Sequence, residues 1–306
     1  MEIKKLWFLI LFLTMFVEGC VSESSDRIKI GILPIEDSLP FLVAKEEGIF
    51  EKHGLMVEIV EFNSALERDS ALTAKEIDFA ITDPLAVILL RSQGFDIKII
   101  SICLGKTSKE GVFAILASPN SSIDSIEDIN GKEIAVSQNT IIEFATDMML
   151  APYNITYYTI PISDIKLRMQ NLLDNKIELA TLPEPLASYA VAKGAKLLIS
   201  DAMLEESLTQ TVIVVRGDLK KEVAKKFLEA YNEAVEKINS NPQKYRSAFV
   251  TIARVPADIA SEYPMPNYPK PEKFPKEFYE KYLSWAIRKG LLRAEVRYED
   301  AVYDIS

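Results

Sequence analysis

The chain has 306 residues, of which 48% are hydrophobic and 26% are charged, so it is long enough to bury a sizeable core. Its formal net charge of −10 excludes a basic, nucleic-acid-binding protein, because phosphates repel an acidic surface. Two cysteines exclude a disulfide framework. A single histidine excludes a zinc cluster or a serine–histidine triad. We therefore expect neither a metal nor a cofactor.

The first twenty residues carry the pattern of a secretion signal. Two lysines precede an apolar run over 6–17, and a glycine stands directly before Cys20. The run is too short to span a bilayer, so it predicts a signal peptide over 1–19. The Gly-Cys pair resembles the bacterial lipobox and predicts lipidation of Cys20. Glu18 departs from that pattern and leaves an uncleaved anchor as the alternative. In both cases the rest of the chain lies outside the cytoplasm, beyond a polar linker over 20–26.

Strands and short helices alternate after the linker. The pattern predicts a strand over 27–33, a helix over 39–47 and a strand over 55–62. Ser64 and Glu67 then have capping-box spacing, which predicts the start of another helix. Strands that alternate with helices of about ten residues indicate a mostly parallel sheet.

One pattern occurs twice, over 77–100 and over 177–198. Each copy has an apolar strand, an acid followed by proline, a short helix, a glycine and a second apolar strand. The acid is expected to cap the helix, the proline to occupy its first turn and the glycine to end it. The two acidic corners are Asp83-Pro84 and Glu184-Pro185. The repeat predicts two similar α/β lobes.

The remaining elements complete these lobes. The polar segment over 106–111 is expected to cross to the second lobe, and the segment over 208–211 to cross back. The first lobe would then comprise residues 27–105 and 211–306, and the second lobe residues 106–210. The elements predicted after residue 110 are strands over 111–118, 133–136, 155–160 and 210–215, and helices over 140–150, 164–174, 218–238 and 276–289. The proline-rich residues 256–275 predict an ordered wrap on the surface, with a flexible linker as the alternative.

Polar residues follow several strands of the predicted sheets. In parallel sheets, ligands bind beyond the carboxyl ends of the strands, where helices begin. Each polar residue there could also be a plain helix cap, but their recurrence at successive strand ends favours a binding site. The candidate ligand-binding residues are Asp37, Ser38, Asn63, Ser64, Thr82, Asp83, Ser137, Asn139, Thr140, Glu143 and Glu184.

Three stretches, over 31–34, 48–58 and 128–136, carry a family resemblance. The most specific is 48–58, which has the form Gly-x-Phe-x-x-x-Gly-Leu-x-Val-Glu. The chain resembles ABC-transporter solute-binding proteins, specifically the nitrate/sulfonate/taurine and thiamine-pyrimidine precursor branch. The resemblance implies a type-two periplasmic-binding fold, in which two α/β lobes with mixed or parallel sheets are joined by two hinge crossings and close on a ligand.

The resemblance also implies a function. The chain would be a monomeric lipoprotein that captures a small solute and delivers it to a membrane permease driven by a cytoplasmic ATPase, without catalysis. The alternatives are an enzyme on the same fold that resembles the chorismate dehydratases, a nitrate, sulfonate or taurine binder, and a sensor domain with a membrane partner. The secretion signal argues against the enzyme, since those dehydratases act in the cytoplasm.

The predicted corners also bear on the ligand. Asp37, Asp83, Glu143 and Glu184 would repel a small inorganic anion, and burying unpaired charge costs several kcal/mol. Some of these acids could simply cap helices and point away. If two or more face inward, the ligand is expected to be a neutral or cationic nitrogenous solute, such as an aminopyrimidine-like heterocycle or an amine.

Overall fold

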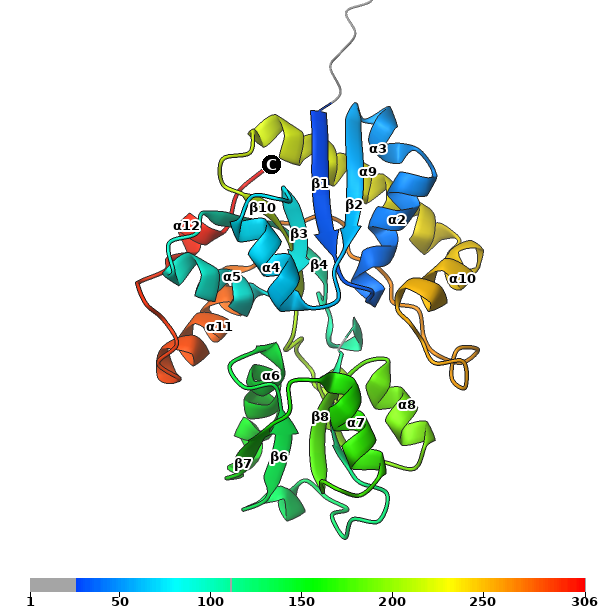
Figure 1. Cartoon of the computed structure of the whole chain (residues 1–306), viewed down its shortest axis with the longest axis vertical. Coiled ribbons are helices and arrows are strands. Elements are labelled where there is room, and N and C mark those ends of the chain that lie inside the picture. Colours follow the sequence, from blue (N-terminus) through cyan, green and yellow to red (C-terminus); the bar gives the residue numbers. More distant parts are fainter. Residues whose placement is uncertain (1–25, 111, 306) are drawn as a thin grey trace, which may run out of the picture.

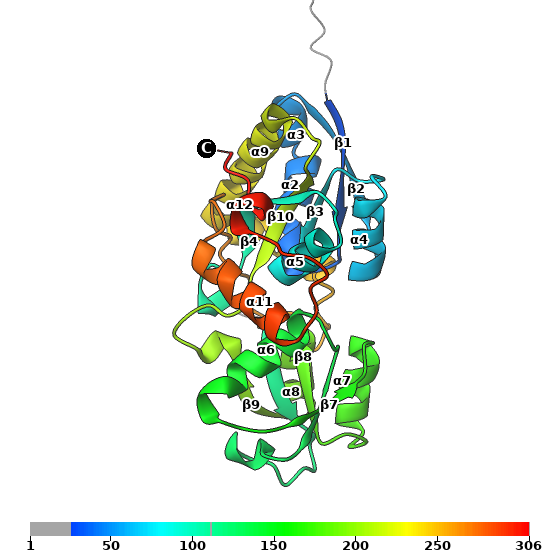
Figure 2. The ribbon, with the colours of Figure 1, turned by 90° about the vertical axis from the view of Figure 1, so that its left-hand side faces the viewer.

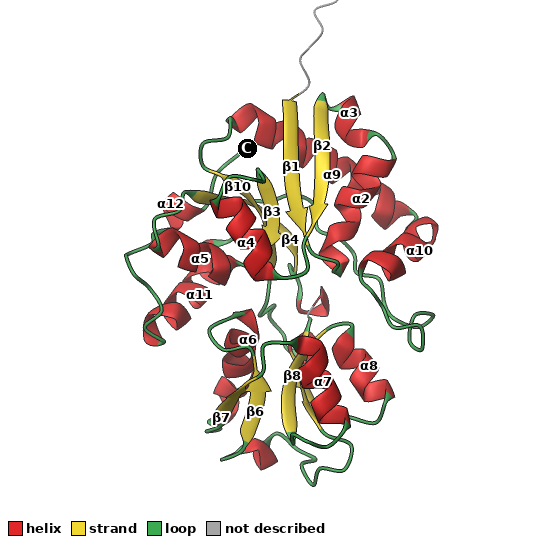
Figure 3. Cartoon of the chain, viewed as in Figure 1, coloured by secondary structure: helices red, strands yellow, loops and turns green. Residues whose placement is uncertain are grey.

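The computed structural model describes residues 26–110 and 112–305, so the predicted signal peptide and Cys20 lie outside the described residues. The described residues form two lobes stacked along the long axis of the molecule, each around one five-stranded sheet (Figures 1 and 3). The α/β fold with two mixed sheets predicted from the sequence is confirmed. Within the described residues, no helix is both long enough and apolar enough to cross a membrane.

The first sheet has the strand order β2-β1-β3-β10-β4. Strand β1 is parallel to both β2 and β3, whereas β10 is antiparallel to β3 and β4. Its strands are β1 (Asp26–Ile32), β2 (Leu55–Glu61), β3 (Phe79–Thr82), β4 (Ile97–Leu104) and β10 (Thr211–Arg216).

The second sheet has the order β7-β6-β8-β5-β9 and repeats this arrangement. Strand β6 is parallel to β7 and β8, and β5 is antiparallel to β8 and β9. Its strands are β5 (Phe113–Ala117), β6 (Glu133–Val136), β7 (Tyr158–Pro161), β8 (Leu179–Pro183) and β9 (Lys196–Ser200).

The two repeat copies occupy matching places. The first copy supplies β3, α5 (Pro84–Ser92) and β4, and the second supplies β8, α8 (Leu186–Ala192) and β9. In each copy an antiparallel strand separates the two repeat strands: β10 in the first sheet and β5 in the second. Both inserted strands follow a crossing between the lobes. Each crossing therefore leads into an interior strand of a sheet rather than into an edge strand.

The inserted strands divide the core by side-chain alternation. In β10, Val212 and Val214 face one apolar cluster, and Ile213 and Val215 face another. In β5, Ile115 joins the same cluster as Val212, whereas the neighbouring side chains of β5 join a third cluster. We call the cluster that runs through both lobes the shared core. Each lobe also has a private core on its other face.

Helices cover both faces of the first sheet. The apolar residues of the long helix α9 recur with a 3.6-residue period, so they share one face, and this face is buried: Val223, Phe227, Ala230, Ala234 and Ile238. Helix α10 was not predicted; it begins with Pro242 in its first turn. The helical elements around this sheet are η1 (Glu36–Ser38), α2 (Leu39–Glu46), α3 (Ile49–Lys52), α4 (Ala65–Thr73), α5, α9 (Lys221–Ser240), α10 (Pro242–Ile252), α11 (Lys276–Arg288) and α12 (Tyr298–Ala301).

The second lobe is smaller. Its α-helices are α6 (Ile141–Leu150), α7 (Ile165–Leu173) and α8, and short turns of 3-10 helix are η2 (Ser108–Glu110), η3 (Glu127–Ile129), η4 (Ala151–Tyr153) and η5 (Asp201–Met203). Its private core consists of alanine and leucine: Ala114, Leu116, Ala135, Leu172, Ala180, Leu182, Ala187, Ala190 and Ala195.

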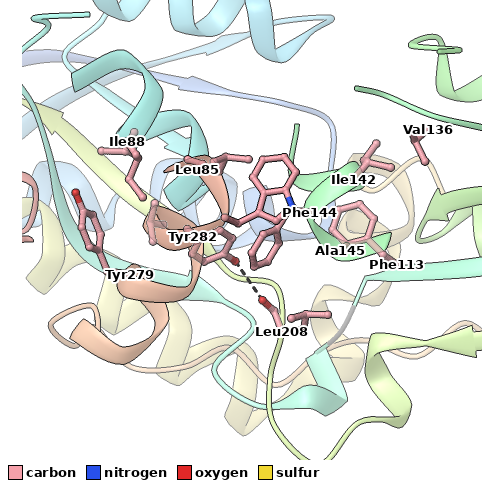
Figure 4. Close-up of a cluster of buried hydrophobic side chains, with 14 of the residues drawn as sticks. Leu85, Ile88, Phe113, Val136, Ile142, Phe144, Ala145, Leu208, Tyr279 and Tyr282 are labelled. Carbon is pink, nitrogen blue, oxygen red and sulfur yellow. Dashed lines mark hydrogen bonds between the residues drawn. The ribbon is translucent and has the colours of Figure 1, made fainter. Parts of the chain in front are cut away.

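The proline-rich segment is the predicted ordered wrap. It contains no regular helix or strand, and it buries Tyr263 and Tyr268 against the private core of the first lobe. Helix α11 follows it and runs from the first lobe toward α6 of the second (Figure 2). There Phe144 of α6 stacks on Tyr282 with ring centroids 4.4 Å apart and meets Trp285 edge-on, which joins the lobes through the shared core (Figure 4).

The two crossings run in close contact. A side chain at Gly105, where φ is +85°, would meet the Thr209 carbonyl oxygen at 2.2 Å, so only glycine fits there. Ser207 Oγ donates to the Gly105 carbonyl at 2.5 Å. Asp201, beside the returning crossing, accepts from Phe113 N–H and from Thr209 Oγ1. These hydrogen bonds fix the path of both crossings.

Candidate functional site

The carboxyl ends of the parallel strands in both sheets face the space between the lobes. The arrowheads of β1 and β2 point toward the second lobe (Figure 1). The carboxylate of Glu184, at the end of β8, lies close enough to Glu36, just after β1, to help raise the pKa of Glu36. Strand ends and helix starts of both lobes therefore meet at one place, which is where ligands bind in open α/β sheets.

The turn after β1 holds two buried acids. Burial raises the pKa of Glu36 to about 8, and it raises the pKa of Asp37 to about 6. Tyr263 of the proline-rich wrap donates its hydroxyl hydrogen to Glu36. Ser38, also predicted for the site, donates to the Leu33 carbonyl at 2.6 Å and stabilises the turn itself.

The corner after β8 differs from its counterpart after β3. Asp83 caps α5 by accepting from Ala86 N–H at 2.8 Å, with Pro84 in the first turn, as predicted. The prediction for the second corner was wrong, because the Glu184-Pro185 bond is cis and Pro185 is itself the N-cap residue of α8. Glu184 instead accepts from the backbone N–H and the hydroxyl of Ser188, and burial raises its pKa.

The other candidates of the first lobe are strand-end and cap residues. Ser64 Oγ caps α4 by accepting from Glu67 N–H, and the exposed Asn63 donates its N–H to the Glu67 carboxylate. Thr82, the last residue of β3, is 3% exposed and accepts from Arg68 at 2.7 Å. Burial raises the pKa of Asp83 to about 6.

The candidates of the second lobe surround the start of α6. Thr140 caps this helix by accepting from Ile142 N–H, and Asn139 is exposed with φ +60°. Glu143 accepts from Asn139 N–H at 2.6 Å and pairs with Lys289 at 2.5 Å, so its carboxylate is held by α11. Ser137 accepts from Arg168 at 3.0 Å and is 6% exposed.

Four important residues were not among the predicted site residues: Glu36, Tyr263 and the two buried arginines. Glu36 directly precedes Asp37, which was predicted for the site. Its burial marks Glu36 as a site residue, and the sequence alone does not show that burial. Arg68 and Arg168 each lie one turn into a helix, which is a repeated signal that a longer alignment of the two repeat copies reveals. No group of three or more His, Cys, Asp or Glu side chains suited to a metal occurs within residues 26–110 and 112–305.

Comparisons with known proteins identify the family of this chain. The family model described as NlpA lipoprotein matches residues 28–253. The chain belongs to the NlpA lipoprotein family. A Bacillus subtilis (strain 168) relative, named as an aliphatic sulfonates-binding protein, is 36% identical over 121 residues, which cover 37% of this chain and 34% of that protein. A Brachyspira hyodysenteriae relative, named as an ABC transporter periplasmic binding protein, is 23% identical over 72% of this chain and 68% of its own length.

The solved structures show the same fold. The periplasmic aliphatic sulphonate binding protein SsuA from Escherichia coli has a TM-score of 0.77 and 16% identity, and the match covers 91% of this chain and 92% of that one. The predicted resemblance to ABC-transporter solute-binding proteins with a periplasmic-binding fold is confirmed. The Brachyspira and Escherichia proteins are named as periplasmic binding proteins, and nothing in the comparisons supports the enzyme alternative.

Proposed function

We propose that this chain is the solute-binding component of an ABC importer. It captures a small solute between its lobes, residues 27–105 with 211–306 and residues 106–210, and delivers the solute to a permease and its cytoplasmic ATPase. It acts as a monomer held at the outer face of the cell membrane by lipid on Cys20. Substituting Cys20→Ser should release the protein from the membrane fraction, and retention there would show that the segment is an uncleaved anchor.

The observation that supports a nitrogenous ligand is the acid group Glu36, Asp37 and Glu184, drawn from both lobes. Burial raises the pKa of all three carboxyls, because it disfavours their charged forms. A protonated amine bound beside them would restore their charged forms and donate charge-assisted hydrogen bonds to the carboxylates. Glu143 contributes less, since Lys289 already neutralises it.

A second candidate ligand class is the aliphatic sulfonates, which the names of the Bacillus and Escherichia relatives specify. The two classes are compatible in one molecule. Taurine-like solutes carry a protonated amine and a sulfonate together. For such a solute, the acids Glu36, Asp37 and Glu184 would bind the amine, and hydrogen-bond donors elsewhere in the site would bind the sulfonate.

The experiment is calorimetric titration of the full chain in detergent with ethylamine, taurine, ethanesulfonate, nitrate and an aminopyrimidine. We expect the amine-bearing solutes to bind and Glu184→Gln to weaken them by about 1–3 kcal/mol. The matched control is Glu178→Gln, because Glu178 lies near the start of the same strand, is exposed and pairs with Lys132. Tight binding of nitrate or ethanesulfonate, with no binding of amines and no effect of Glu184→Gln, would overturn the ligand class.

A further inference from the structure

An ion pair joins the two lobes on the side of the molecule opposite α11. Lys193, at the end of α8 in the second lobe, lies 2.5 Å from Asp258 of the proline-rich wrap, which belongs to the first lobe. Figure 1 shows α8 and α11 on opposite sides of the molecule. The other ion pairs that join the lobes within residues 26–110 and 112–305 lie along α11 or beside the first crossing: Lys281–Glu206, Lys289–Glu143, Lys289–Asp147 and Lys106–Glu272. The Lys193–Asp258 pair therefore lies where the lobes separate if α11 stays on α6.

The segment that carries Asp258 is fixed to the first lobe. We call residues 256–264, the first part of the wrap, the strap. Arg246 of α10 donates to the Ala260 carbonyl at 2.6 Å. The buried ring of Tyr263 stacks on Phe249 of the same helix, with ring centroids 6.2 Å apart. Because these contacts hold the strap on α10, it must move with the first lobe, and the place of Asp258 does not depend on Lys193.

The strap approaches both ends of α8. Asp258 meets Lys193, the residue that follows the helix. At the other end, Tyr263 donates its hydroxyl hydrogen to Glu36, and Glu184 precedes the helix by two residues. Burial raises the pKa of the Tyr263 hydroxyl, and the nearby carboxylates of Glu36 and Glu184 raise it further. The strap therefore runs along α8 in the direction opposite to the helix, and it meets the second lobe at two points.

These two points act in opposite directions when no solute is bound. Closing the lobes brings Glu184 toward Glu36, and this costs free energy because two like charges repel or one carboxylate must take up a proton. The Lys193–Asp258 pair favours the same closed arrangement. Its side chains are 43% and 55% exposed, so the attraction is modest. A modest attraction is nevertheless enough to change the ratio of two lobe arrangements that are close in free energy.

We propose that the strap is a closing device of the first lobe and that the Lys193–Asp258 pair is its latch on α8. When the lobes separate on this side, the latch breaks and Glu184 moves away from Glu36. When they close, the latch forms again and holds the strap along α8. The inference rests on the proposed function only in that the lobes open and close around a solute, and it is independent of the class of that solute.

The test is hydrogen exchange followed by mass spectrometry, on the full chain in detergent and without any solute. At low salt, we expect Lys193→Gln to accelerate exchange by about 2- to 5-fold over residues 184–193 and 256–264, because it removes one exposed ion pair. Exchange in α6 and α11 should not change. High salt screens exposed charges, so the unmodified chain should then exchange as fast as the variant over the same residues.

A charge swap separates the latch from a local role of Lys193 in α8. A lysine at the end of a helix also interacts favourably with the helix dipole, and Lys193 lies over the ring of Tyr189. Lys193→Glu should therefore accelerate exchange more than Lys193→Gln, both through the dipole and through repulsion of Asp258. Adding Asp258→Lys to Lys193→Glu restores the attraction between the lobes but not the interaction with the dipole. We expect this double variant to return exchange over 256–264 to the rate of the unmodified chain.

The matched control is Lys132→Gln. Lys132 and Glu178 form a similarly exposed ion pair of 3.1 Å, but both belong to the second lobe. This variant should leave exchange in the strap and in α8 unchanged.

Three results would overturn the latch: unchanged exchange in Lys193→Gln at low salt, a charge swap that fails to restore the strap, or equal acceleration in α6 and α11. Because no solute is present, any of these leaves the proposed solute-binding function standing. Conversely, a chain that binds none of the titrated solutes but shows the expected exchange keeps the latch and loses the proposed ligand class.

Discussion

On one face of its sheet the first lobe has an aromatic private core, in which Phe227 stacks on Phe79, Phe50 and Phe41. Among the described residues, the fully buried members of the second lobe's private core are all alanine or leucine. Its aromatic partners lie on the opposite face, where Phe144 packs against Tyr282 and Trp285 of the C-terminal helix α11. The same repeated pattern therefore gives one lobe that completes its own core and one that depends on a helix attached to the other.

This difference bears on how the lobes move. A hinge motion that opened the site freely would have to separate α6 from α11, exposing Phe144 and breaking the bonds of Asp147 to Trp285 and of Glu143 to Lys289. Burial of aromatic surface opposes that separation. We expect α11 to remain on α6 while the site opens on the opposite side, near the proline-rich wrap and α8.

The largest expected effects test this dependence directly. Replacing Trp285 by alanine should cost about 3–5 kcal/mol, because it removes a fully buried ring and leaves Asp147 without its indole donor. Hydrogen exchange should accelerate first in α6 and in β6 and β8, while α2 and α9 keep their protection. Phe227→Ala is the matched control, with a similar cost and the reverse pattern. If both variants lose protection uniformly, the two lobes unfold as one unit and the comparison between them fails.

The sequence predicted much of this architecture because local rules decided it. The caps Ser64, Asp83, Thr140 and Asp164 and the amphipathic face of α9 are settled by neighbouring residues. What could not be predicted depends on distant residues. Glu143 has cap spacing in the sequence, but it is neutralised by Lys289, which lies 146 residues away. The Glu184 corner also departs from its counterpart: Glu184 hydrogen-bonds to Ser188, and Pro185, the residue after it, is the N-cap of α8.

The comparison extends to charge, because the first lobe holds Glu36 and Asp37 where the second contributes Glu184. Burial raises the pKa of Glu36 from 4.5 to about 8. Folding therefore favours the protonated form, and this contribution to stability is complete below pH 4.5 and is lost as the pH rises toward 8. We expect the chain to lose about 3–4 kcal/mol of unfolding free energy through this group between pH 5 and pH 8.

Urea denaturation of the unmodified chain and of Glu36→Gln at pH 5, 6.5 and 8 measures this contribution. The glutamine variant should lose less stability over that range, and the difference isolates Glu36 from Asp37 and Glu184, which act in the same direction. Glu47→Gln is a suitable control. Hydrogen bonds from Lys244 and Lys237 lower the pKa of Glu47 to about 2, so its contribution is lost only in acid. Equal pH slopes for the chain and Glu36→Gln would mean that Glu36 is ionised in the folded protein.

The smallest expected effect tests whether the repeat copies are equivalent at the level of the backbone. Gly94 ends α5 with φ +94°, and Gly194 ends α8 with φ +99°. Each glycine donates its N–H to the carbonyl three residues before it at 2.9 Å, and the following residue donates to the carbonyl five residues before it. A methyl group at Gly94 would meet nothing within 4 Å, and at Gly194 only Pro119 at 3.8 Å, an ordinary contact.

Alanine in this left-handed region costs about 1–2 kcal/mol, and the loss of unfolded-state freedom returns roughly half of that. Gly94→Ala and Gly194→Ala should therefore each cost about 1 kcal/mol in urea denaturation and differ by less than about 0.5 kcal/mol, the usual limit for independent sites. A clearly larger cost at Gly194 would show that the loop around Pro119 tightens the second copy, and that the two lobes differ in their backbone constraints as well as in their cores.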